Sequence, residues 1–392
     1  MSGIRYQWWL LAAAVATLLA ACGSNTSAPS GQASSQSTVR TYYIAAEEVA
    51  WDYAPSGIDQ ITGKPFGTME TPYVVRGAHR IGRVYRKAMY REYTDGSFTR
   101  LKPRSANDRY LGILGPIIHA EVGDTIKVVF KNKATRPYSI HPHGVLYKKD
   151  SEGVAYHDGS SGDDKMGGAV PPGATYTYTW EVPERAGPGP NDPSSVVWFY
   201  HSHVDDQKDT ESGLIGALVV TARGMARPDG TPKDVDREFV TLFDIFNENQ
   251  SWYLQHNIDA YAPLVKGPIK AETIPLDEQG AFTLNGSGFV DTNFKFTING
   301  YLYGNGPLMT MKKGDRVRWY VLAFGNGFNF HIPHWHGNTV LAANQRTDVL
   351  NLAPAQMMTV DMVPDNPGTW LYHCHVSDHM HAGMSALYQV DP

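Results

Sequence analysis

Short segments of the chain alternate apolar and polar residues, as the strands of a half-buried β-sheet do. In EVGDTIKVVFKN the side chains of Ile126, Val128 and Phe130 fall on one face, and ATYTYTWEV has the same period of two. Glycine and proline separate these segments, and patterns with the helical period are scarce. The chain is therefore predicted to be all-β, folded as an antiparallel sandwich or barrel.

The strand pattern occurs twice. MKKGDRVRWYVLAFGNG, residues 311–327, repeats the features of residues 121–132, and FYHSHVDDQKDTESGLIGALVV parallels LYHCHVSDHMHAGMSALYQV. Residues 221–236 are polar and rich in glycine and proline, which is typical of a linker. We expect two copies of one β-domain, at residues 41–224 and 237–392.

The composition fits a globular protein and excludes one class of partner. Hydrophobic residues make up 42% of the 392 positions and charged residues 19%, so the chain is long and apolar enough for a sizeable core. The net charge is −5. A nucleic-acid partner is not expected, because no basic field would attract one.

Residues 1–22 resemble a bacterial lipoprotein signal peptide. Arg5 precedes an apolar run at residues 8–19, which is too short for a permanent membrane span, and the motif LAAC ends at Cys22. We expect acyl chains on Cys22 and a flexible tether at residues 23–40. The mature protein would then work outside the cytoplasm, on the periplasmic or cell-surface side of a bacterial membrane. The alternative is an ordinary secretory signal with an incidental cysteine.

The second of the two cysteines, Cys374, has no intrachain partner once Cys22 carries lipid. It lies between His373 and His375 in LYHCHVSDHMHAGM. In an oxidising compartment a lone thiol is a liability unless something binds it. Cys374 is thus either a buried stray thiol or a metal ligand.

Histidines occur in four His-x-His pairs at matching places in the two halves. Residues i and i+2 of a strand point to the same face, so each pair presents two imidazoles side by side. Eight imidazoles brought together suit copper or zinc. The pairs are His141 and His143, His201 and His203, His334 and His336, and His373 and His375.

A different ligand set surrounds Cys374. One thiolate, the imidazoles of His331 and His379 and the thioether of Met384 form the ligand set of a blue copper centre, although Met384 could also be a core residue. Cys374 would face away from its flanking histidines on the strand, so this site would lie back to back with theirs. The matching positions in the first half offer no such set and are Tyr138, Ser202, Gln207 and Ser212.

These motifs identify a family resemblance. HPHG, YHSH, HIPHWHG and HCHVSDHMHAGM resemble the four signature motifs of multicopper oxidases, and most of residues 41–390 is similar to ceruloplasmin and its relatives. The resemblance implies two cupredoxin-like Greek-key domains. It also implies an enzyme that oxidises a donor by one electron at type 1 copper and reduces dioxygen to water, by four electrons, at a trinuclear copper cluster.

The resemblance also assigns ligands for about four copper ions. Type 1 copper would take His331, Cys374, His379 and Met384, and type 2 copper would take His141 and His334. The two type 3 ions would take His143, His201, His203, His336, His373 and His375. Electrons would pass from Cys374 through its neighbours His373 and His375. Two-domain members share each cluster between subunits, so a homotrimer is expected.

The resemblance leaves the electron donor open. Ceruloplasmin-like enzymes oxidise Fe(II) with acidic residues beside type 1 copper, and Asp378 and Asp291 match such acids, unless they are ordinary surface carboxylates. The chain departs from the family pattern at Phe296, where we expect a histidine, and at Gly327, where we expect a glutamate. A laccase-like oxidation of phenols and an oxidation of Cu(I) remain alternatives. The thioether sulfur of Met380 is the first candidate contact for Cu(I), followed by those of Met357, Met358 and Met362, unless these are core residues. His381 is interpreted as a surface histidine.

A loop after His143 resembles a calcium-binding loop of ceruloplasmin. Asp163 and Asp164 would supply carboxylates and Lys149 a carbonyl oxygen, which suits Ca²⁺. A solvated acidic turn is the alternative.

Two other functions compete with a multicopper oxidase. A copper nitrite reductase is also a two-domain trimer, but it keeps blue copper in its first domain, where Tyr138 and Ser202 offer no ligand set. A non-catalytic copper-sequestering lipoprotein would take up copper without consuming dioxygen.

Overall fold

The computed structural model describes residues 38–266, 288–325 and 329–392. Cys22 and Gly327 lie outside these residues. Ser37–Pro392 forms one compact unit, and strands dominate its regular structure, so the all-β prediction is confirmed. The division into domains at residues 41–224 and 237–392 stays a prediction.

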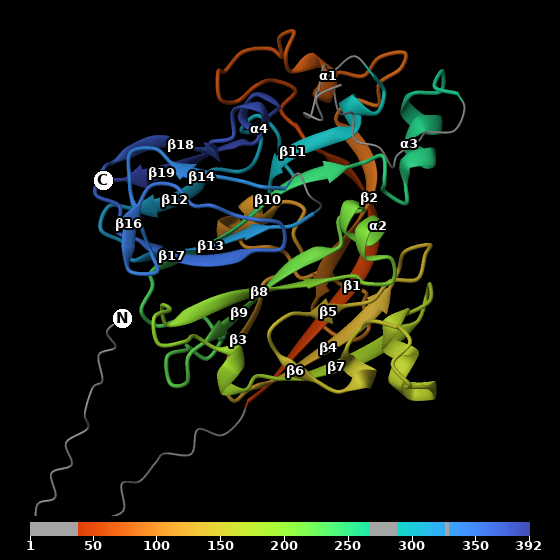
Figure 1. Ribbon diagram of the computed structural model, residues 1–392, viewed down its shortest axis with the longest axis vertical. Helices are drawn as coiled ribbons and strands as arrows, with labels where there is room; N and C mark the ends of the chain where they lie inside the picture. Colours follow the sequence, from red (N-terminus) through yellow and green to blue (C-terminus); the bar gives the residue numbers. More distant parts are fainter. Residues whose placement is uncertain (1–37, 267–287, 326–328) are drawn as a thin grey trace, which may run out of the picture. The chain divides into compact units, whose positions relative to one another are not determined.

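Two sheets are built from the first half of the chain (Figure 1). The first has the order β2-β1-β4-β7-β6 and contains β1 (Val39–Asp52), β2 (Val84–Tyr93), β4 (Thr125–Asn132), β6 (Leu146–Tyr147) and β7 (Thr175–Glu181). The second has the order β3-β9-β8-β5 and contains β3 (Ile118–Glu121), β5 (His141–Pro142), β8 (Ser195–His201) and β9 (Ile215–Thr221).

The second half builds two more sheets on the same plan (Figure 1). One has the order β11-β10-β13-β17-β15-β16 and contains β10 (Arg237–Asn247), β11 (Phe294–Ile298), β13 (Val317–Ala323), β15 (Val340–Ala342), β16 (Gln345–Thr347) and β17 (Met357–Met362). The other has the order β12-β19-β18-β14 and contains β12 (Met309–Lys312), β14 (Pro333–Trp335), β18 (Gly368–Cys374) and β19 (Ser385–Asp391).

The strand pairing repeats between the halves. β5 pairs with β8 and β8 with β9, just as β14 pairs with β18 and β18 with β19. The purely antiparallel arrangement that we predicted is wrong in detail, because β1–β4, β3–β9, β10–β13 and β12–β19 are parallel pairs. Each parallel pair is joined by a long crossover, and local alternation carries no information about strand direction.

Helices are short and lie between strands. The α-helices are α1 (Thr71–Val74), α2 (Asp206–Glu211), α3 (Leu254–Tyr261) and α4 (Ser377–His381). The 3-10 helices are η1 (Ala106–Leu111), η2 (Lys149–Ser151), η3 (Gly162–Gly168), η4 (Glu184–Ala186) and η5 (Asp291–Asn293). α2 follows β8 and α4 follows β18, so each is preceded by a His-x-His pair. None of the described helices combines the length and apolar character that a bilayer crossing requires.

The core explains the alternating pattern. Ile126, Val128 and Phe130 are fully buried on one face of β4, as the sequence predicted. One hydrophobic cluster joins the two halves, since it includes Phe199 of β8 and Trp319 of β13. Burying both halves against one another removes apolar surface from water, and this positions the histidine-bearing strand ends on a rigid frame.

Candidate metal centres

Four histidines of the first half gather where β5 and β8 lie side by side. His141 and His201 are cross-strand partners, and His143 and His203 follow two residues later on each segment. The His141 ring lies 5.3–5.5 Å from the other three rings, measured between centroids. Nε2 of His143 and Nε2 of His201 are 3.2 Å apart. We call this set the first quartet: His141, His143, His201 and His203.

Hydrogen bonds orient two rings of the first quartet. Nδ1 of His141 donates to the carbonyl of Glu152 at 2.7 Å, which leaves Nε2 as the free acceptor. Nδ1 of His201 lies 3.0 Å from both the Ser202 carbonyl and the Asp206 carboxylate. Burial lowers the pKa of His141 and of His143 to about 4. The neutral imidazoles that a metal requires are therefore present at neutral pH.

The second half repeats the arrangement between β14 and β18. His334 and His373 are cross-strand partners, and Nε2 of His373 lies 3.0 Å from Nε2 of His336 and 3.1 Å from Nδ1 of His334. The His375 ring is 5.2 Å from the His334 ring. Nδ1 of His373 donates to the Cys374 carbonyl at 2.8 Å. We call this set the second quartet: His334, His336, His373 and His375.

The second quartet opens onto the surface. A pocket of about 380 Å³ is lined by His334, His336, Asp348 and Asp365, among others. The Asp348 carboxylate lies 3.6 Å from Nε2 of His334. Among the described residues, no ring contact joins a histidine of one quartet to a histidine of the other. Each half thus presents its own group of imidazoles, in which His201 and His373 are buried and the others are partly or fully exposed.

A third cluster is buried beside the second quartet. Ligand atoms of His331, Cys374 and His379 all lie within 4.8 Å of one another. The Cys374 Sγ is 3.9 Å from Nδ1 of His331 and 3.6 Å from Nδ1 of His379, and it accepts a hydrogen bond from the Ile332 amide. Met384 is fully buried, and its carbonyl accepts from the Cys374 amide at 3.1 Å. We call His331, Cys374 and His379 the thiol cluster.

The chemistry of the thiol cluster fits copper. Burial lowers the pKa of His379 to about 4 and that of His331 well below its usual range, so both rings are neutral donors. Burial also raises the pKa of the Cys374 thiol, and a bound metal would replace its proton. One thiolate and two imidazoles in a dry pocket form the equatorial ligand set of a blue copper centre.

The first half has hydrogen bonds where the thiol cluster would be. The hydroxyls of Tyr138 and Tyr253 are 2.9 Å apart, and the Ser202 hydroxyl donates to Asp209 at 2.6 Å. The other two matching positions have polar partners as well: Gln207 bonds to Gln250, and Ser212 bonds to Ser251. The equivalent site is therefore filled by polar contacts between protein groups.

Two acids lie near the thiol cluster. Asp378 is exposed in the first turn of α4, and Asp291 is 6% exposed in η5. Burial, together with the negative charges of Asp291 and Asp378, raises the pKa of Tyr73 to about 12, so both carboxylates act on this hydroxyl. Phe296 packs on His379. Among the methionines considered as contacts for Cu(I), Met362 is buried, and Met357, Met358 and Met380 are half-buried. His381 is exposed.

The predicted calcium loop has a lysine beside its acids. Lys149 Nζ lies 2.7 Å from Glu152 and 2.8 Å from Asp158, so its ammonium neutralises two carboxylates. Asp163 is exposed in η3, and of Asp164 only the backbone is described.

Sequence reasoning missed the groups that orient the ligands. Asn329 Oδ1 lies 3.0 Å from Nε2 of His331, and the Glu152 carbonyl and the Asp206 carboxylate hold rings of the first quartet. A carbonyl has no sequence signature. Only the two-residue spacing of Asn329 from His331 could have hinted at this contact.

Comparison with known proteins places these clusters in a family. Two family models, both described as multicopper oxidase, match residues 105–224 and 273–392. Ferroxidase HEPHL1 of Homo sapiens is 45% identical over 355 residues, which cover 90% of this chain and 29% of that protein. Ceruloplasmin of Mus musculus is 41% identical and covers 90% of this chain and 31% of that protein. The chain thus spans about three-tenths of the length of these relatives.

Solved structures show the same fold. The crystal structure of a blue copper oxidase from Nitrosomonas europaea superposes with a TM-score of 0.55 at 19% identity, covering 90% of this chain and 86% of that chain. This likeness confirms the predicted all-β, cupredoxin-like fold class. Since multicopper oxidase models match both halves and relatives align over nine-tenths of its length, the chain belongs to the multicopper oxidase family.

Proposed function

We propose that the protein is a copper oxidase that couples one-electron oxidation of a donor at the thiol cluster to four-electron reduction of dioxygen at the histidine quartets. The observation that carries this proposal is the position of Cys374. Its side chain belongs to the thiol cluster, while its neighbours His373 and His375 belong to the second quartet. The covalent chain therefore links a candidate electron-receiving site directly to a candidate oxygen site.

Ligand roles follow from the clusters. His331, Cys374, His379 and Met384 would hold type 1 copper. His141 and His334 would hold type 2 copper, and the remaining six histidines of the quartets would hold the type 3 pair. Copper would supply the one-electron acceptor and the dioxygen-reducing centre. Burial keeps the rings of His141, His143, His373 and His379 neutral, backbone carbonyls orient those of His141, His201 and His373, and Cys374 is buried away from water.

We propose a homotrimer in which the first quartet of one subunit meets the second quartet of the next. Support comes from the ring contacts of the described residues, none of which joins the two quartets, and from the open pocket beside the second. A trinuclear cluster needs ligands from both quartets, and a closed ring of identical interfaces would supply them three times.

Fe(II) is the donor class that we propose first. The acids Asp291 and Asp378 lie around Tyr73 beside the thiol cluster, and hard oxygen ligands suit iron. Two relatives, at 45% and 44% identity, carry the name ferroxidase, which supports the same donor. Phe296 removes one expected iron ligand, so Cu(I) and phenols are the competing donors.

An oxygen electrode tests the oxidase proposal. Copper-loaded protein lacking residues 1–22 is given Fe(II), Cu(I) and a phenol in separate runs. We expect dioxygen uptake with at least one donor, in a ratio of one dioxygen to four donor electrons. Full copper occupancy without uptake for any donor would overturn the proposal and favour the sequestering lipoprotein.

Nitrite reduction is the second candidate activity. A copper nitrite reductase from Nitrosomonas europaea shares the fold, with a TM-score of 0.53 at 15% identity. The hydrogen-bonded Tyr138 and Ser202 of the first half argue against it, because they leave no blue copper ligand set in that half. Anaerobic nitrite consumption by the copper-loaded protein would reverse this ranking.

Two further proposals concern sites away from copper. Acyl chains on Cys22 would hold the protein outside the cytoplasm, and mass spectrometry of the mature amino terminus tests this. Calcium at Lys149, Asp163 and Asp164 is the weaker proposal, because the Lys149 ammonium already neutralises nearby acids. Calorimetric titration with Ca²⁺ tests it.

A further inference from the structure

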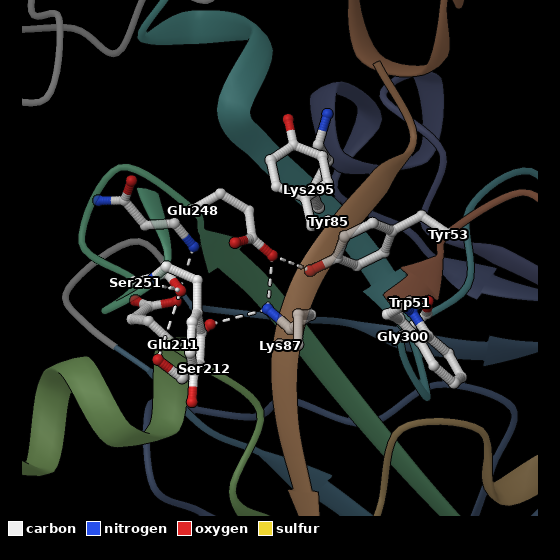
Figure 2. A network of polar contacts seen from close by, with 12 residues as sticks. Trp51, Tyr53, Tyr85, Lys87, Glu211, Ser212, Glu248, Ser251, Lys295 and Gly300 are labelled. Atoms are coloured by element: carbon white, nitrogen blue, oxygen red, sulfur yellow. Dashed lines mark hydrogen bonds and ion pairs between the residues drawn. The ribbon is translucent and has the colours of Figure 1, made fainter. Parts of the chain in front are cut away.

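A buried cluster of ionisable side chains lies between the two halves (Figure 2). Lys87 of β2 and Glu248, just after β10, are both 0% exposed, and Lys87 Nζ lies 2.5 Å from the Glu248 carboxylate. Lys87 also donates to the carbonyl of Glu211 at 2.8 Å, and the Tyr53 hydroxyl donates to the same Glu248 oxygen. Glu211, at the end of α2, accepts from the Asn247 amide at 2.7 Å.

Acids outnumber the cations that face them in this cluster. Asp244 of β10 is 3% exposed and brings the number of buried carboxyls to three, beside Glu211 and Glu248. Lys87 pairs with Glu248. The other buried cation, Lys295 of β11, donates to the carbonyls of Tyr73, Gly82 and Thr292. Glu211 and Asp244 form no ion pair with any described residue, and they lie close enough for the charge on Asp244 to act on Glu211.

A buried pair of carboxyls retains a proton. Burial raises the pKa of Asp244 to about 7, and burial together with the charge on Asp244 raises the pKa of Glu211 well above its usual range. Ionising both carboxyls of a buried pair costs free energy, because the two negative charges repel each other and lose their hydration. The Lys87 ammonium lowers the pKa of both acids. Burial raises the pKa of the Tyr53 and Tyr85 hydroxyls, so both stay protonated.

Asn329 connects this pair to the thiol cluster. Its Oδ1 accepts from the Ile245 amide at 2.7 Å and lies 3.0 Å from Nε2 of His331, so the oxygen faces the ligand. Its Nδ2 is buried and has no partner among the described residues, and the same holds for Asp244 Oδ1. A Cβ placed on Gly325 would lie 2.0 Å from that Nδ2 and 3.0 Å from that Oδ1. An unused donor and an unused acceptor thus lie close together, within the span of one bridging water.

We propose that Asp244, with Glu211 as its partner, is a positioning residue of the thiol cluster that sets its reduction potential through Asn329 and His331. The inference rests on the proposed function, because it requires copper at the thiol cluster. When an electron arrives at the cluster, the carboxyl pair takes up one proton from water. When the electron leaves toward the second quartet, the pair returns that proton. A negative Asp244 favours the more positive, oxidised state of the site, and a protonated Asp244 favours the reduced state.

An anaerobic redox titration of the blue absorbance tests this at several pH values around 7. We expect the reduction potential to fall as pH rises through the range in which the carboxyl pair loses its proton. Full coupling of one proton to one electron sets a limit of about 59 mV for each tenfold change in proton concentration. Asp244→Asn should abolish the slope and hold the potential at its low-pH value. A wild-type potential that does not change with pH would overturn the proposal, and so would a slope that persists in Asp244→Asn.

Two further variants keep the test decisive. Glu211→Gln removes the second carboxyl of the pair, so the pH range in which the potential falls should shift; an unchanged curve contradicts the proposal even if Asp244→Asn fails to fold. Asp209→Asn is the matched control, since Asp209 is a buried acid of α2 that bonds to Ser202 and Trp252. It should keep the wild-type slope. Protein without any blue absorbance would refute the proposed function, whereas a pH-independent blue site refutes only this inference.

Discussion

The ring of Phe296 packs against the imidazole of His379, with 5.4 Å between the ring centroids. Phe296 is fully buried in β11, at the position where the family resemblance predicts an iron-binding histidine. An aromatic ring offers iron no ligand. The donor question therefore depends on Asp291 and Asp378, the two acids around Tyr73.

Removing a carboxylate should separate iron oxidation from phenol oxidation. In Asp378→Ala we expect kcat/KM for Fe(II) to fall by about 10- to 100-fold, the range typical of losing a group that supports a metal site, while phenol oxidation stays near wild type. Steady-state dioxygen uptake with each donor measures both. Asp192→Ala, an exposed acid of the first half, is the control. Equal losses for both donors would count against an iron site.

Replacing the thiol should remove one copper ion and the colour. In Cys374→Ser we expect the blue absorbance to disappear, because a serine hydroxyl is not a soft thiolate, while copper at the quartets is retained. Metal analysis and visible spectroscopy measure this together. Ser202→Ala, the matching position of the first half, should stay blue. Persistent blue colour in Cys374→Ser would refute the ligand assignment.

Subunit mixing should restore a site that neither variant has alone. One variant carries His141→Ala and His143→Ala, and the other carries His334→Ala and His336→Ala. If the quartets pair between subunits, co-expression gives mixed trimers in which about a quarter of the interfaces join two intact quartets. Dioxygen uptake should return to that fraction. Mixing the separately purified variants without subunit exchange is the control, and no recovery on co-expression contradicts the trimer.

Copper should resist acid down to about pH 5. Burial lowers the pKa of His141, His143, His373 and His379 to about 4, so protons compete with the metal only near that pH. Metal analysis after dialysis at stepped pH values measures the loss. Half-loss near pH 6.5, the value for an ordinary histidine, would contradict the buried sites.

In the metal-free protein the same histidines make the folded state acid-sensitive. Between about pH 4 and 6.5 the unfolded chain binds more protons at these four positions than the folded chain does. Their contribution to the free energy of unfolding therefore falls as pH falls through this range. Substituting one buried histidine, as in His141→Ala, should reduce the slope of melting temperature against pH for the metal-free protein.

The strand pattern, the duplication and the types of candidate ligand can all be read from the amino-acid sequence. A period of two requires the members of each His-x-His pair to share a face, and the contrast between Cys374 and Ser202 assigns the thiol to one half. The strand pattern is confirmed because it depends on residues close together in the chain, and the domain bounds and ligand roles stay predictions. The parallel strand pairs escaped them, since alternation does not reveal strand direction.

Contacts between distant parts of the chain become visible only in the folded protein. The Tyr138–Tyr253 contact and the hydrogen bond from the Ile245 amide to Asn329 both join segments that lie far apart in the sequence. No local pattern predicts such contacts, because long-range packing brings these segments together. Burial in that packing also lowers the pKa of the histidines and raises that of the carboxyl pair, which no spacing of residues reveals.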